Sequence, residues 1–312
     1  MNPQRYLVLG GTGFIGSHLL AALAPSGCQV TVLSRNREKG RAITVLPNVC
    51  SFSADVYERK VLEKHLKDHD AVINLVGILN ETGKSTFTHA HVDLTATLIA
   101  ACRNVGVRRI HQMSALNAGN RASKYLKTRG EAEAQVRNSG MEWTIYRPSV
   151  VYGVNDGLVY RFLKLMKLGP VLPLAQPHAK MAPAYVGDVA DAMVRCLADR
   201  GSIGRIYELY GPDTLELIQI VRMVCATAGL RRAVIPLPAS LGRLQAIAAE
   251  LIPTKPFSLD NFHTLGVDAV GTRDGFGELG IEPRRFAAML PMLLGETARA
   301  YMFDVARATQ EQ

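Results

Sequence analysis

Glycines near the start of the chain have the spacing of a phosphate-binding turn. They stand at positions 10, 13 and 16, directly after the apolar residues 6–9. The first allows a tight turn, the second lets the backbone approach a pyrophosphate, and the third lets the next helix pack on the strand. That helix would point its amides and dipole at the phosphates; the alternative is an ordinary glycine turn. Six residues are predicted to contact a dinucleotide here: Gly10, Thr12, Gly13, Phe14, Ile15 and Gly16.

The residues after the second predicted strand, 29–33, indicate which dinucleotide is bound. Sites that prefer NAD place an acid here for the ribose 2′-hydroxyl. This chain instead has Ser34, Arg35 and Arg37, and the first acid is Glu38. An arginine fork can pair with a 2′-phosphate, and a serine hydroxyl can donate to it. We therefore predict NADP(H), with NAD(H) less favoured; the alternative is that these residues are exposed loop charges.

Residues at the ends of the fourth and fifth predicted strands would lie beside the middle of the cofactor. These strands are predicted at 71–76 and 109–113. Ligands of an open parallel sheet bind beyond the carboxyl ends of its strands. The polar residues 80–89 are expected to form a loop over the site. Four residues are predicted to contact the cofactor at this edge: Leu75, Val76, Gly77 and Met113.

A helix predicted to begin after Ser123 carries an acid–base candidate. Tyr125 and Arg129 are four residues apart, so they share one helix face. A tyrosine serves as acid or base when a nearby cation lowers its pKa from about 10. Arg129 supplies the charge, but a guanidinium is not interchangeable with the ammonium of a lysine. The alternative is that Tyr125 is a packed helix residue and that Arg129 pairs with Glu133 or a phosphate.

Alternating apolar strands and helical patterns predict an α/β fold with a Rossmann-type doubly wound parallel sheet. Helices are expected at 57–67 and 92–104. Residues 1–155 and 184–212 are assigned to the dinucleotide-binding Rossmann domain. Residues 156–183 and 213–300 form a smaller, mostly helical substrate-side subdomain, and 301–312 a tail. The sheet is predicted to contain residues 6–9, 29–33, 49–53, 71–76, 109–113, 143–146 and 205–209.

Composition narrows the class of protein. The 312 residues are 48% hydrophobic, which is typical of a globular chain. No run reaches the ~18 apolar residues of a membrane span, and no signal peptide precedes the first strand, so a cytoplasmic location is expected. The five cysteines are widely spaced without a ligand cluster. They are predicted to be buried reduced thiols, with no disulfide and no metal site.

The basic balance of the chain bears on its partners. A formal net charge of +9 arises from basic residues scattered in pairs such as Arg108–Arg109. No RNA-binding aromatic pattern accompanies them, so no nucleic-acid partner is expected. Two alternatives stay open: a solvated basic surface, or a patch that lies against the inner face of a membrane.

The motifs together resemble the short-chain dehydrogenase/reductase superfamily in its extended or atypical branch, whose members are epimerase/dehydratase-like. The resemblance rests on the Gly-Gly-Thr-Gly-Phe-Ile-Gly turn, the Ser-Arg-Asn-Arg run, the weak Tyr-x-x-x-Arg and the run Arg-Pro-Ser-Val-Val-Tyr-Gly at 147–153. Segments 257–270 and 279–281 are similar to one atypical family. It comprises the NADPH-binding accessory subunit of respiratory complex I and its bacterial relatives.

The resemblance implies roles for further residues. Asp55 would accept from the adenine amine while Val56 covers the ring; Asp55 is equally a candidate helix N-cap. Ser114 and Tyr125 match the catalytic serine and tyrosine, and Arg129 stands where active members have lysine; all three are catalytic candidates and would also contact the cofactor. The segment 186–190 would tether the second domain to the first. Four residues would meet the nicotinamide end: Arg147, Pro148, Ser149 and Val150.

The sequence therefore leaves three functions open. The first is an atypical member that holds NADPH tightly with weak or no turnover, linked to a respiratory complex or to quinone metabolism. The second is an active NADPH-dependent reductase or epimerase/dehydratase on a small carbonyl, quinone or sugar-like substrate. The third is a sensor that reports the NADPH/NADP⁺ ratio to a partner.

Overall fold

The computed structural model describes residues 3–36, 38, 41, 43–83, 85–154, 157–252 and 257–295. Arg37, which is a predicted cofactor ligand, and the predicted tail 301–312 lie outside the described residues.

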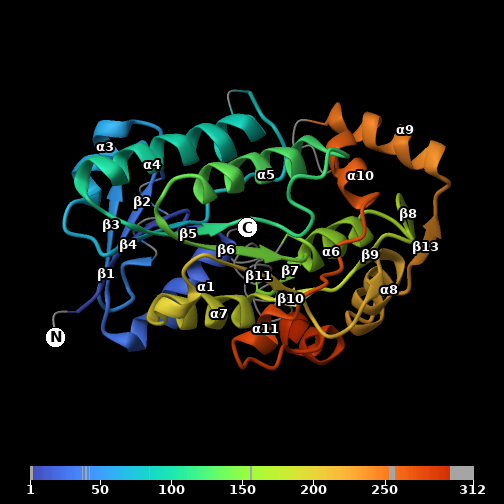
Figure 1. The fold of residues 1–312 in the computed structure, drawn as a ribbon. Helices are drawn as coiled ribbons and strands as arrows, with labels where there is room; N and C mark the ends of the chain where they lie inside the picture. Colours follow the sequence, from blue (N-terminus) through green and yellow to red (C-terminus); the bar gives the residue numbers. More distant parts are fainter. Residues whose placement is uncertain are drawn as a thin grey trace, which may run out of the picture.

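Seven parallel strands form the central sheet, in the order β3-β2-β1-β4-β5-β6-β11 (Figure 1). The strand order reverses between β1 and β4, so a ligand crevice is expected beyond their carboxyl ends. The predicted Rossmann-type sheet is thereby confirmed. Its strands are β1 (Arg5–Leu9), β2 (Gln29–Ser34), β3 (Val49–Ser53), β4 (Ala71–Asn74), β5 (Arg109–Met113), β6 (Glu142–Pro148) and β11 (Arg205–Leu209).

Helices cover both faces of this sheet (Figure 1). Helices α1 (Phe14–Leu23) and α7 (Val186–Ala198) lie on one face. Helices α3 (Arg59–Leu66), α4 (Leu94–Val105) and α5 (Lys124–Arg137) lie on the other. Since both faces are covered, the inner strands β1 and β4 are apolar over most of their length and buried on both sides.

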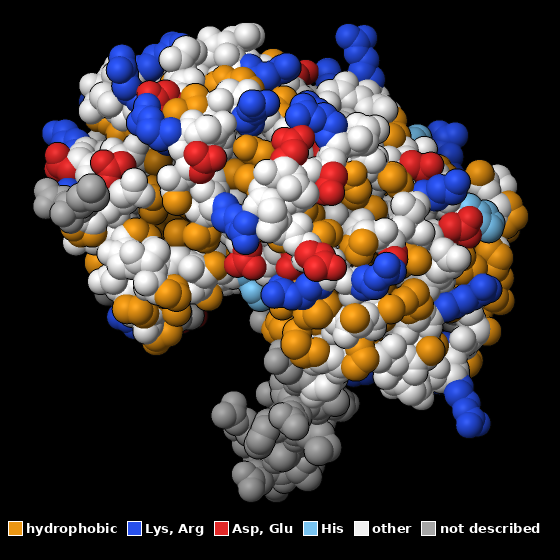
Figure 2. All heavy atoms as spheres, turned by 60° about the horizontal axis from the view of Figure 1, so that its bottom comes forward, with side chains coloured by type: hydrophobic (Ala, Val, Ile, Leu, Met, Phe, Trp, Pro, Cys, Tyr) orange, Lys and Arg blue, Asp and Glu red, His pale blue; other side chains and the backbone are white. Residues whose placement is uncertain are grey.

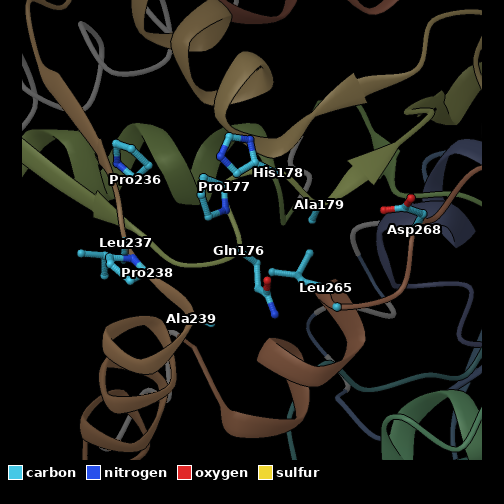
Figure 3. A pocket seen from close by; sticks show the side chains of 11 residues that line it. Gln176, Pro177, His178, Ala179, Pro236, Leu237, Pro238, Ala239, Leu265 and Asp268 are labelled. Atoms are coloured by element: carbon cyan, nitrogen blue, oxygen red, sulfur yellow. The ribbon is translucent and has the colours of Figure 1, made fainter.

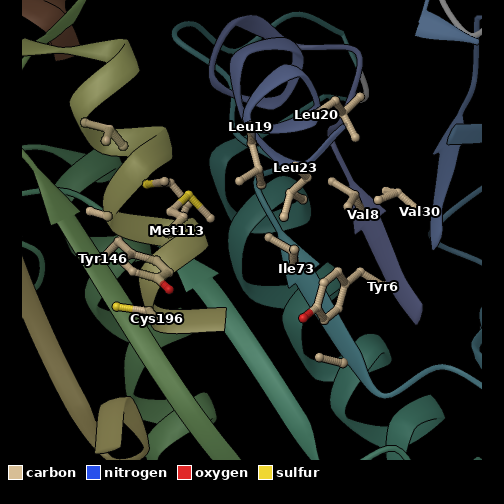
Figure 4. Close-up of a cluster of buried hydrophobic side chains, with 14 of the residues drawn as sticks. Tyr6, Val8, Leu19, Leu20, Leu23, Val30, Ile73, Met113, Tyr146 and Cys196 are labelled. Atoms are coloured by element: carbon tan, nitrogen blue, oxygen red, sulfur yellow. The ribbon is translucent and has the colours of Figure 1, made fainter. Parts of the chain in front are cut away.

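Side chains of one strand feed two separate cores. Tyr6 and Val8 of β1 belong to the core under α1 and α7, whereas Leu7 and Leu9 belong to the core under α3 and α4. Figure 4 shows Leu19, Leu20 and Leu23 of α1 pointing at the strands that carry Val8 and Ile73. The alternation follows from the two-residue period of a strand, and it fixes α1, and with it the glycine turn, on the sheet.

Three predicted boundaries are wrong, each for a local reason. The helix expected at 57–67 is α3, from Arg59, because Asp55 Oδ1 accepts from the Tyr57 N–H at 3.0 Å in a turn; Glu58, not Asp55, is the N-cap. The strand expected to reach 76 ends at Asn74, whose side-chain oxygen accepts from the Val76 N–H at 3.2 Å. The predicted loop 80–89 ends in a π-helical turn, η2 (Thr88–Asp93), which continues into α4.

The remaining chain forms small elements around a core of its own, which contains Tyr152, Met166 and Phe286. Buried Asp188 on α7 accepts from the backbone and the guanidinium of Arg284, both at 2.7 Å, and so fastens the last segment to the Rossmann helices. The proposed division into two domains stays a prediction. The helices and strands of the chain not yet named are η1 (Ala24–Ser26), β7 (Val151–Tyr152), α6 (Val159–Lys167), β8 (Val171–Leu174), β9 (Lys180–Met181), β10 (Ala184–Tyr185), η3 (Arg200–Ser202), β12 (Leu215–Glu216), α8 (Leu217–Thr227), β13 (Ala233–Pro236), α9 (Ala239–Glu250), α10 (Leu259–Leu265) and α11 (Gly275–Glu278).

The structure also bears on the predictions made for the cysteines and for membrane-spanning helices. Cys50 is exposed because β3 is the edge strand of the sheet, so the prediction of buried thiols is wrong at this position; the other four cysteines are buried, and all five are free thiols. Within the described ranges, no three His, Cys, Asp or Glu side chains gather as metal ligands. No helix in the described part of the chain has the length and hydropathy to cross a membrane.

Candidate dinucleotide-binding site

The glycine turn has the geometry that the sequence predicts. Gly10 has φ +79°, and a Cβ there would lie 3.0 Å from the Leu75 carbonyl carbon. The Gly13 N–H donates to the Gly10 carbonyl at 3.0 Å. A Cβ at Gly16 would overlap that same carbonyl, so only glycine lets α1 start this close to β1.

The start of α1 fits an anion. Gly13 is the N-cap, it is exposed, and it has no side chain to cap the helix. The first turn contains no acidic residue. The first backbone N–H groups of a helix have no partner within the helix, so here they can donate to a pyrophosphate. Three predicted contact residues are half-buried around this point: Thr12, Phe14 and Ile15.

After β2, one predicted ligand is accessible and one is engaged. The buried Ser34 hydroxyl donates to the Asn36 carbonyl at 3.0 Å and accepts from the Asn36 N–H at 3.3 Å, so its proton is used within the turn. Arg35 is exposed, with its guanidinium carbon 5.9 Å from the centroid of the Tyr57 ring. Tyr57 in turn stacks on His89, with ring centroids 4.0 Å apart. Arg35 is therefore open to a phosphate beside an aromatic pair that the sequence did not indicate.

Beyond β3, the two residues expected at the adenine differ in exposure. Asp55 is exposed and its carboxylate holds the Tyr57 N–H, so one of its oxygens already has a donor. Val56 is only 6% exposed and packs in the core with Leu62 and Leu66. Val56 thus presents little surface to a ring.

The ends of β4 and β5 are held together by Arg129. Its Nη1 donates to the Met113 carbonyl at 3.0 Å and the Val76 carbonyl at 3.3 Å, and the side chain is buried. Its Nη2 lies so close to Gly77 that a Cβ there would overlap it. Arg129 makes no ion pair with Glu133, so the alternative that paired these two residues is wrong. The predicted contact residues Leu75 and Val76 are half-buried above this arginine.

Tyr125 lies in an aromatic cluster beside this arginine. Helix α5 begins as predicted, with the Ser123 hydroxyl accepting from the Leu126 N–H at 3.2 Å. The guanidinium carbon of Arg129 is 5.4 Å from the centroid of the Tyr125 ring. Phe87 and His91 meet the same ring edge-on, at 5.8 and 5.6 Å.

His91 is a buried neutral base next to the site. Its Nδ1 is 2.8 Å from Thr128 Oγ1, while that hydroxyl lies 2.9 Å from the Lys124 carbonyl and donates to it. His91 Nδ1 must then donate to Thr128, which leaves Nε2 as a lone pair with no partner among the described residues. Burial, and then the charge of Arg129, lower the pKa of His91 to about 2. His91 falls between the predicted loop 80–89 and the predicted helix 92–104, so neither prediction gave it a role; the helical spacing of Phe87 and His91 was the available signal.

A buried carboxylate joins Ser114 to Arg147. Ser114 Oγ donates to Glu133 Oε1 at 2.5 Å. Arg147 donates to the same carboxylate through Nε at 2.9 Å and Nη2 at 2.5 Å. Glu133 is 1% exposed, and its hydrogen bonds raise the pKa of Arg147. Glu133 stands four residues after Arg129 on the buried side of α5, which was a sequence signal for a role inside the protein.

The network changes what these side chains can do. A serine hydroxyl has one proton, and that of Ser114 goes to Glu133, so it is not available to a substrate carbonyl. The Nε and Nη2 groups of Arg147 likewise donate to Glu133. Beyond the buried Pro148, the Ser149 hydroxyl donates to the Ala269 carbonyl at 2.7 Å. Ser149 therefore joins the sheet edge to the C-terminal segment, while Val150 is half-buried beside it.

A surface hollow of about 500 Å³ lies in the second half of the chain (Figure 3). None of the predicted cofactor residues lines it. One wall is connected to the sheet, because the Asp268 carbonyl accepts from Asn117, which follows β5, at 2.8 Å. The hollow is lined by Gln176, Pro177, His178, Ala179, Pro236, Leu237, Pro238, Ala239, Leu265, Gly266 and Asp268.

An open parallel sheet, with a glycine turn and a bare helix start at its switch point, defines a dinucleotide-binding Rossmann protein. The chain belongs to the NAD(P)H-binding family, whose model matches residues 10–200, and it is an atypical short-chain dehydrogenase/reductase similar to a subunit of complex I.

Two relatives and one solved structure show the similarity. The mitochondrial NADH-ubiquinone oxidoreductase 40 kDa subunit of Neurospora crassa is 27% identical over 98% of this chain and 82% of its own length. The mitochondrial NADH dehydrogenase [ubiquinone] 1 alpha subcomplex subunit 9 of Arabidopsis thaliana is 29% identical over 84% of this chain and 68% of its own. The NADPH-dependent quinone oxidoreductase QOR2 of Escherichia coli, complexed with NADPH, shares the fold with a TM-score of 0.76 at 18% identity, covering 92% and 99% of the two chains.

Proposed function

We propose that this protein binds NADP(H) tightly and transfers its hydride slowly or not at all. The observation that carries the proposal is the 2.5 Å bond from Ser114 to Glu133. Carbonyl reduction by the superfamily pattern needs a serine proton on the substrate oxygen and a lysine beside the tyrosine. Here that proton goes to a buried carboxylate, and Arg129 donates to two backbone carbonyls. Both side chains are engaged in hydrogen bonds within the protein and are not available for catalysis. This favours tight binding of the nucleotide without hydride transfer.

The choice of NADP(H) over NAD(H) rests on the turn after β2. Arg35 is exposed, and no acid in the turn would repel a 2′-phosphate. A charge-assisted pair between guanidinium and phosphate is among the stronger polar contacts in proteins. When bound beyond the carboxyl ends of β1 and β4, the cofactor would supply a hydride. The residues of this chain would bind the cofactor and exclude water from it.

The comparisons support a partner for the holding protein. Two of its relatives are subunits of mitochondrial NADH–ubiquinone oxidoreductases. One protein of the same fold is a quinone oxidoreductase. We therefore propose association with a respiratory complex, with a quinone as the first substrate class to assay. The proposed location is the cytoplasm, with peripheral contact at the inner face of the membrane.

The experiment starts with protein purified without added nucleotide and passed through repeated desalting. Denatured protein should release close to one NADP(H) per chain, identified by mass spectrometry. Gly13→Val, purified in parallel, should release none. An empty wild-type protein, or one that carries NAD(H) alone, would overturn the proposal.

A second candidate, an active reductase, is favoured by one contact. The guanidinium carbon of Arg129 is 5.4 Å from the Tyr125 ring, so a cation remains beside the tyrosine. Rapid oxidation of bound NADPH by added carbonyl compounds or quinones would support this candidate. Such turnover should then disappear in Tyr125→Phe, because the proton donor is gone.

A further inference from the structure

Helix α9 turns an apolar stripe to the solvent. Leu241, Leu244, Ile247 and Leu251 are 50%, 60%, 44% and 85% exposed. They are three or four residues apart, so they lie along one side of the helix. A water-exposed stripe of this kind is unusual for a helix packed on a globular protein, where the apolar side normally faces the core.

The inner side of α9 accounts for the packing that the helix does have. Gly242 and Ala246 face inward, and a Cβ at Gly242 would lie 3.1 Å from Ala175 and 3.2 Å from Phe262. Gln245 donates to the Pro173 carbonyl at 2.9 Å. Small residues and side-chain hydrogen bonds therefore hold the helix, and its large aliphatic side chains are left outside.

Further apolar side chains are exposed next to this helix. Strands β8 and β13 pair in parallel and expose Val171 and Ile235 at 47% and 46%, and Leu168 before β8 is 84% exposed. Figure 1 places α9, β8 and β13 together at the end of the molecule away from the N-terminus. We call this surface the apolar end: Leu168, Val171, Ile235, Leu241, Leu244, Ile247, Leu251 and Ile252.

Arginines flank the apolar end. Arg222, Arg231 and Arg232 line a hollow of about 410 Å³ together with Val234. Arg232 donates to the Met166 carbonyl at 2.8 Å, which fixes it close to the turn that carries Leu168. In Figure 2, hydrophobic side chains and Lys or Arg side chains both reach the right-hand margin, which is this end of the molecule.

The nearby acids are engaged within the protein. Glu216 completes the capping box of α8 and lies 3.1 Å from His178. Glu250, at the end of α9, accepts from the Leu259 N–H at 2.8 Å. Both carboxylates keep their charge, but the arginines Arg222, Arg231 and Arg232 outnumber them, so this end is aliphatic with an excess of positive charge.

We propose that the apolar end docks on an anionic membrane surface, with α9 lying parallel to the lipid interface; this rests on the peripheral membrane contact in the proposed function and names the surface that makes it. Leucines would enter the boundary of headgroups and acyl chains while the arginines meet lipid phosphates, the two attractions that hold interfacial helices. A protein interface is typically enriched in aromatic residues. The apolar end has only Leu, Ile and Val, and its leucines protrude from a convex helix and do not line a groove.

The test is vesicle co-sedimentation of the full-length protein. Wild type should sediment with vesicles of phosphatidylcholine and phosphatidylserine at low salt, much less with phosphatidylcholine alone. The double variant Leu244→Glu/Leu251→Glu should bind the anionic vesicles at least about tenfold more weakly. The variant Arg231→Glu/Arg232→Glu should lose most of the vesicle binding that disappears when the salt concentration is raised. The matched control is Val45→Glu, which changes an 84% exposed valine of the Rossmann domain and should bind like wild type.

Circular dichroism and bound nucleotide report folding of each variant. Leu244, Leu251, Arg231 and Val45 are exposed and Arg232 is half-buried, so the variants should keep both. Wild type that ignores anionic vesicles, or a Leu244→Glu/Leu251→Glu variant that binds them as well as wild type does, would overturn the proposal. If the wild type instead forms dimers that the same variant abolishes, the apolar end is a protein interface and the membrane proposal is wrong.

Discussion

Ser114 and Glu133 are joined by a 2.5 Å hydrogen bond inside the protein, with the serine hydroxyl as donor and a 1% exposed carboxylate as acceptor. Arg147 closes the other side of the carboxylate with two further bonds. The side chain that resembles a catalytic serine is therefore a donor in a buried ion-pair network.

Glu133→Gln should release the serine proton. An amide at this position can donate to Ser114 Oγ, and the hydroxyl is then free to donate to a substrate carbonyl. We expect single-turnover oxidation of bound NADPH by a carbonyl acceptor to rise on the order of tenfold. Ser114→Ala in the same background should remove the gain. The matched control is Glu131→Gln, an exposed position of α5 that should leave the rate unchanged; an equal rate in Glu133→Gln and wild type would show that the proton is not limiting.

Arg129→Lys should weaken the contacts that hold the ends of β4 and β5 together, and it should place a compact ammonium next to Tyr125. The shorter side chain cannot keep both bonds to the Val76 and Met113 carbonyls. We expect faster nucleotide exchange and a higher rate of hydride transfer, which Tyr125→Phe should abolish. Stopped-flow fluorescence of NADPH gives both rates, with Arg137→Lys at the exposed end of α5 as control. If wild type transfers hydride rapidly and Arg129→Lys slows it, the arginine is a native catalytic cation.

Arg35→Asp should weaken NADPH much more than NADH. The change removes a charge-assisted pair with the 2′-phosphate and adds repulsion, a cost of about 2 kcal/mol or roughly thirtyfold in affinity. Calorimetric titration of both nucleotides measures the difference. Arg200→Asp, at a position whose side chain is 81% exposed and lies outside the predicted site, should change neither affinity. An equal loss for both nucleotides would contradict an NADP(H) site at this turn.

Gly13→Val should abolish dinucleotide binding while the sheet still folds. Gly13 has φ −82°, which any residue adopts, and a Cβ there would lie 3.1 Å from the Gly10 carbonyl oxygen, a tight contact that a small shift relieves. The larger cost lies in the space where a pyrophosphate meets the backbone. Calorimetry should show no binding, with far-ultraviolet circular dichroism unchanged. Gly169→Val adds the same side chain where no heavy atom lies within 4 Å of the new Cβ, and should bind normally. Retained micromolar binding in Gly13→Val would make the motif a turn only.

Acid should destabilise the protein partly through His91. The unfolded chain takes up this proton below about pH 6.5, whereas burial and Arg129 lower the folded pKa to about 2. Between these values the unfolded state binds more protons, so the free energy of unfolding falls as the pH falls. One such histidine accounts for about 2 kcal/mol between pH 7 and pH 5.

Urea denaturation at pH 7 and pH 5 measures that difference. His91→Gln should show a smaller loss of stability between the two pH values than wild type, by about the same 2 kcal/mol. The exposed His178→Gln serves as the substitution control. An unchanged pH dependence in His91→Gln would mean that the folded protein already accepts the proton at this position.

The sequence by itself determined the elements whose signal is local. The strand from Tyr6, the turn of Gly10 and the helix to Leu23 each follow from hydrophobicity and backbone freedom within a few residues, and the structure confirms them. The cap at Ser123 follows in the same way from a single side chain and the next turn. The parallel direction of the strands in the sheet followed from the alternation of strands and helices.

Only the tertiary structure decided what the site side chains do with their hydrogen bonds. The network joins Ser114, which directly follows β5, to Glu133 on α5 and Arg147 on β6. No local sequence pattern predicts that a serine will donate its proton to a carboxylate 19 residues away. The same holds for Arg129, whose partners are carbonyls at two strand ends. The physical reason is that a buried donor must find an acceptor, and which acceptor lies within 3 Å depends on how distant segments pack.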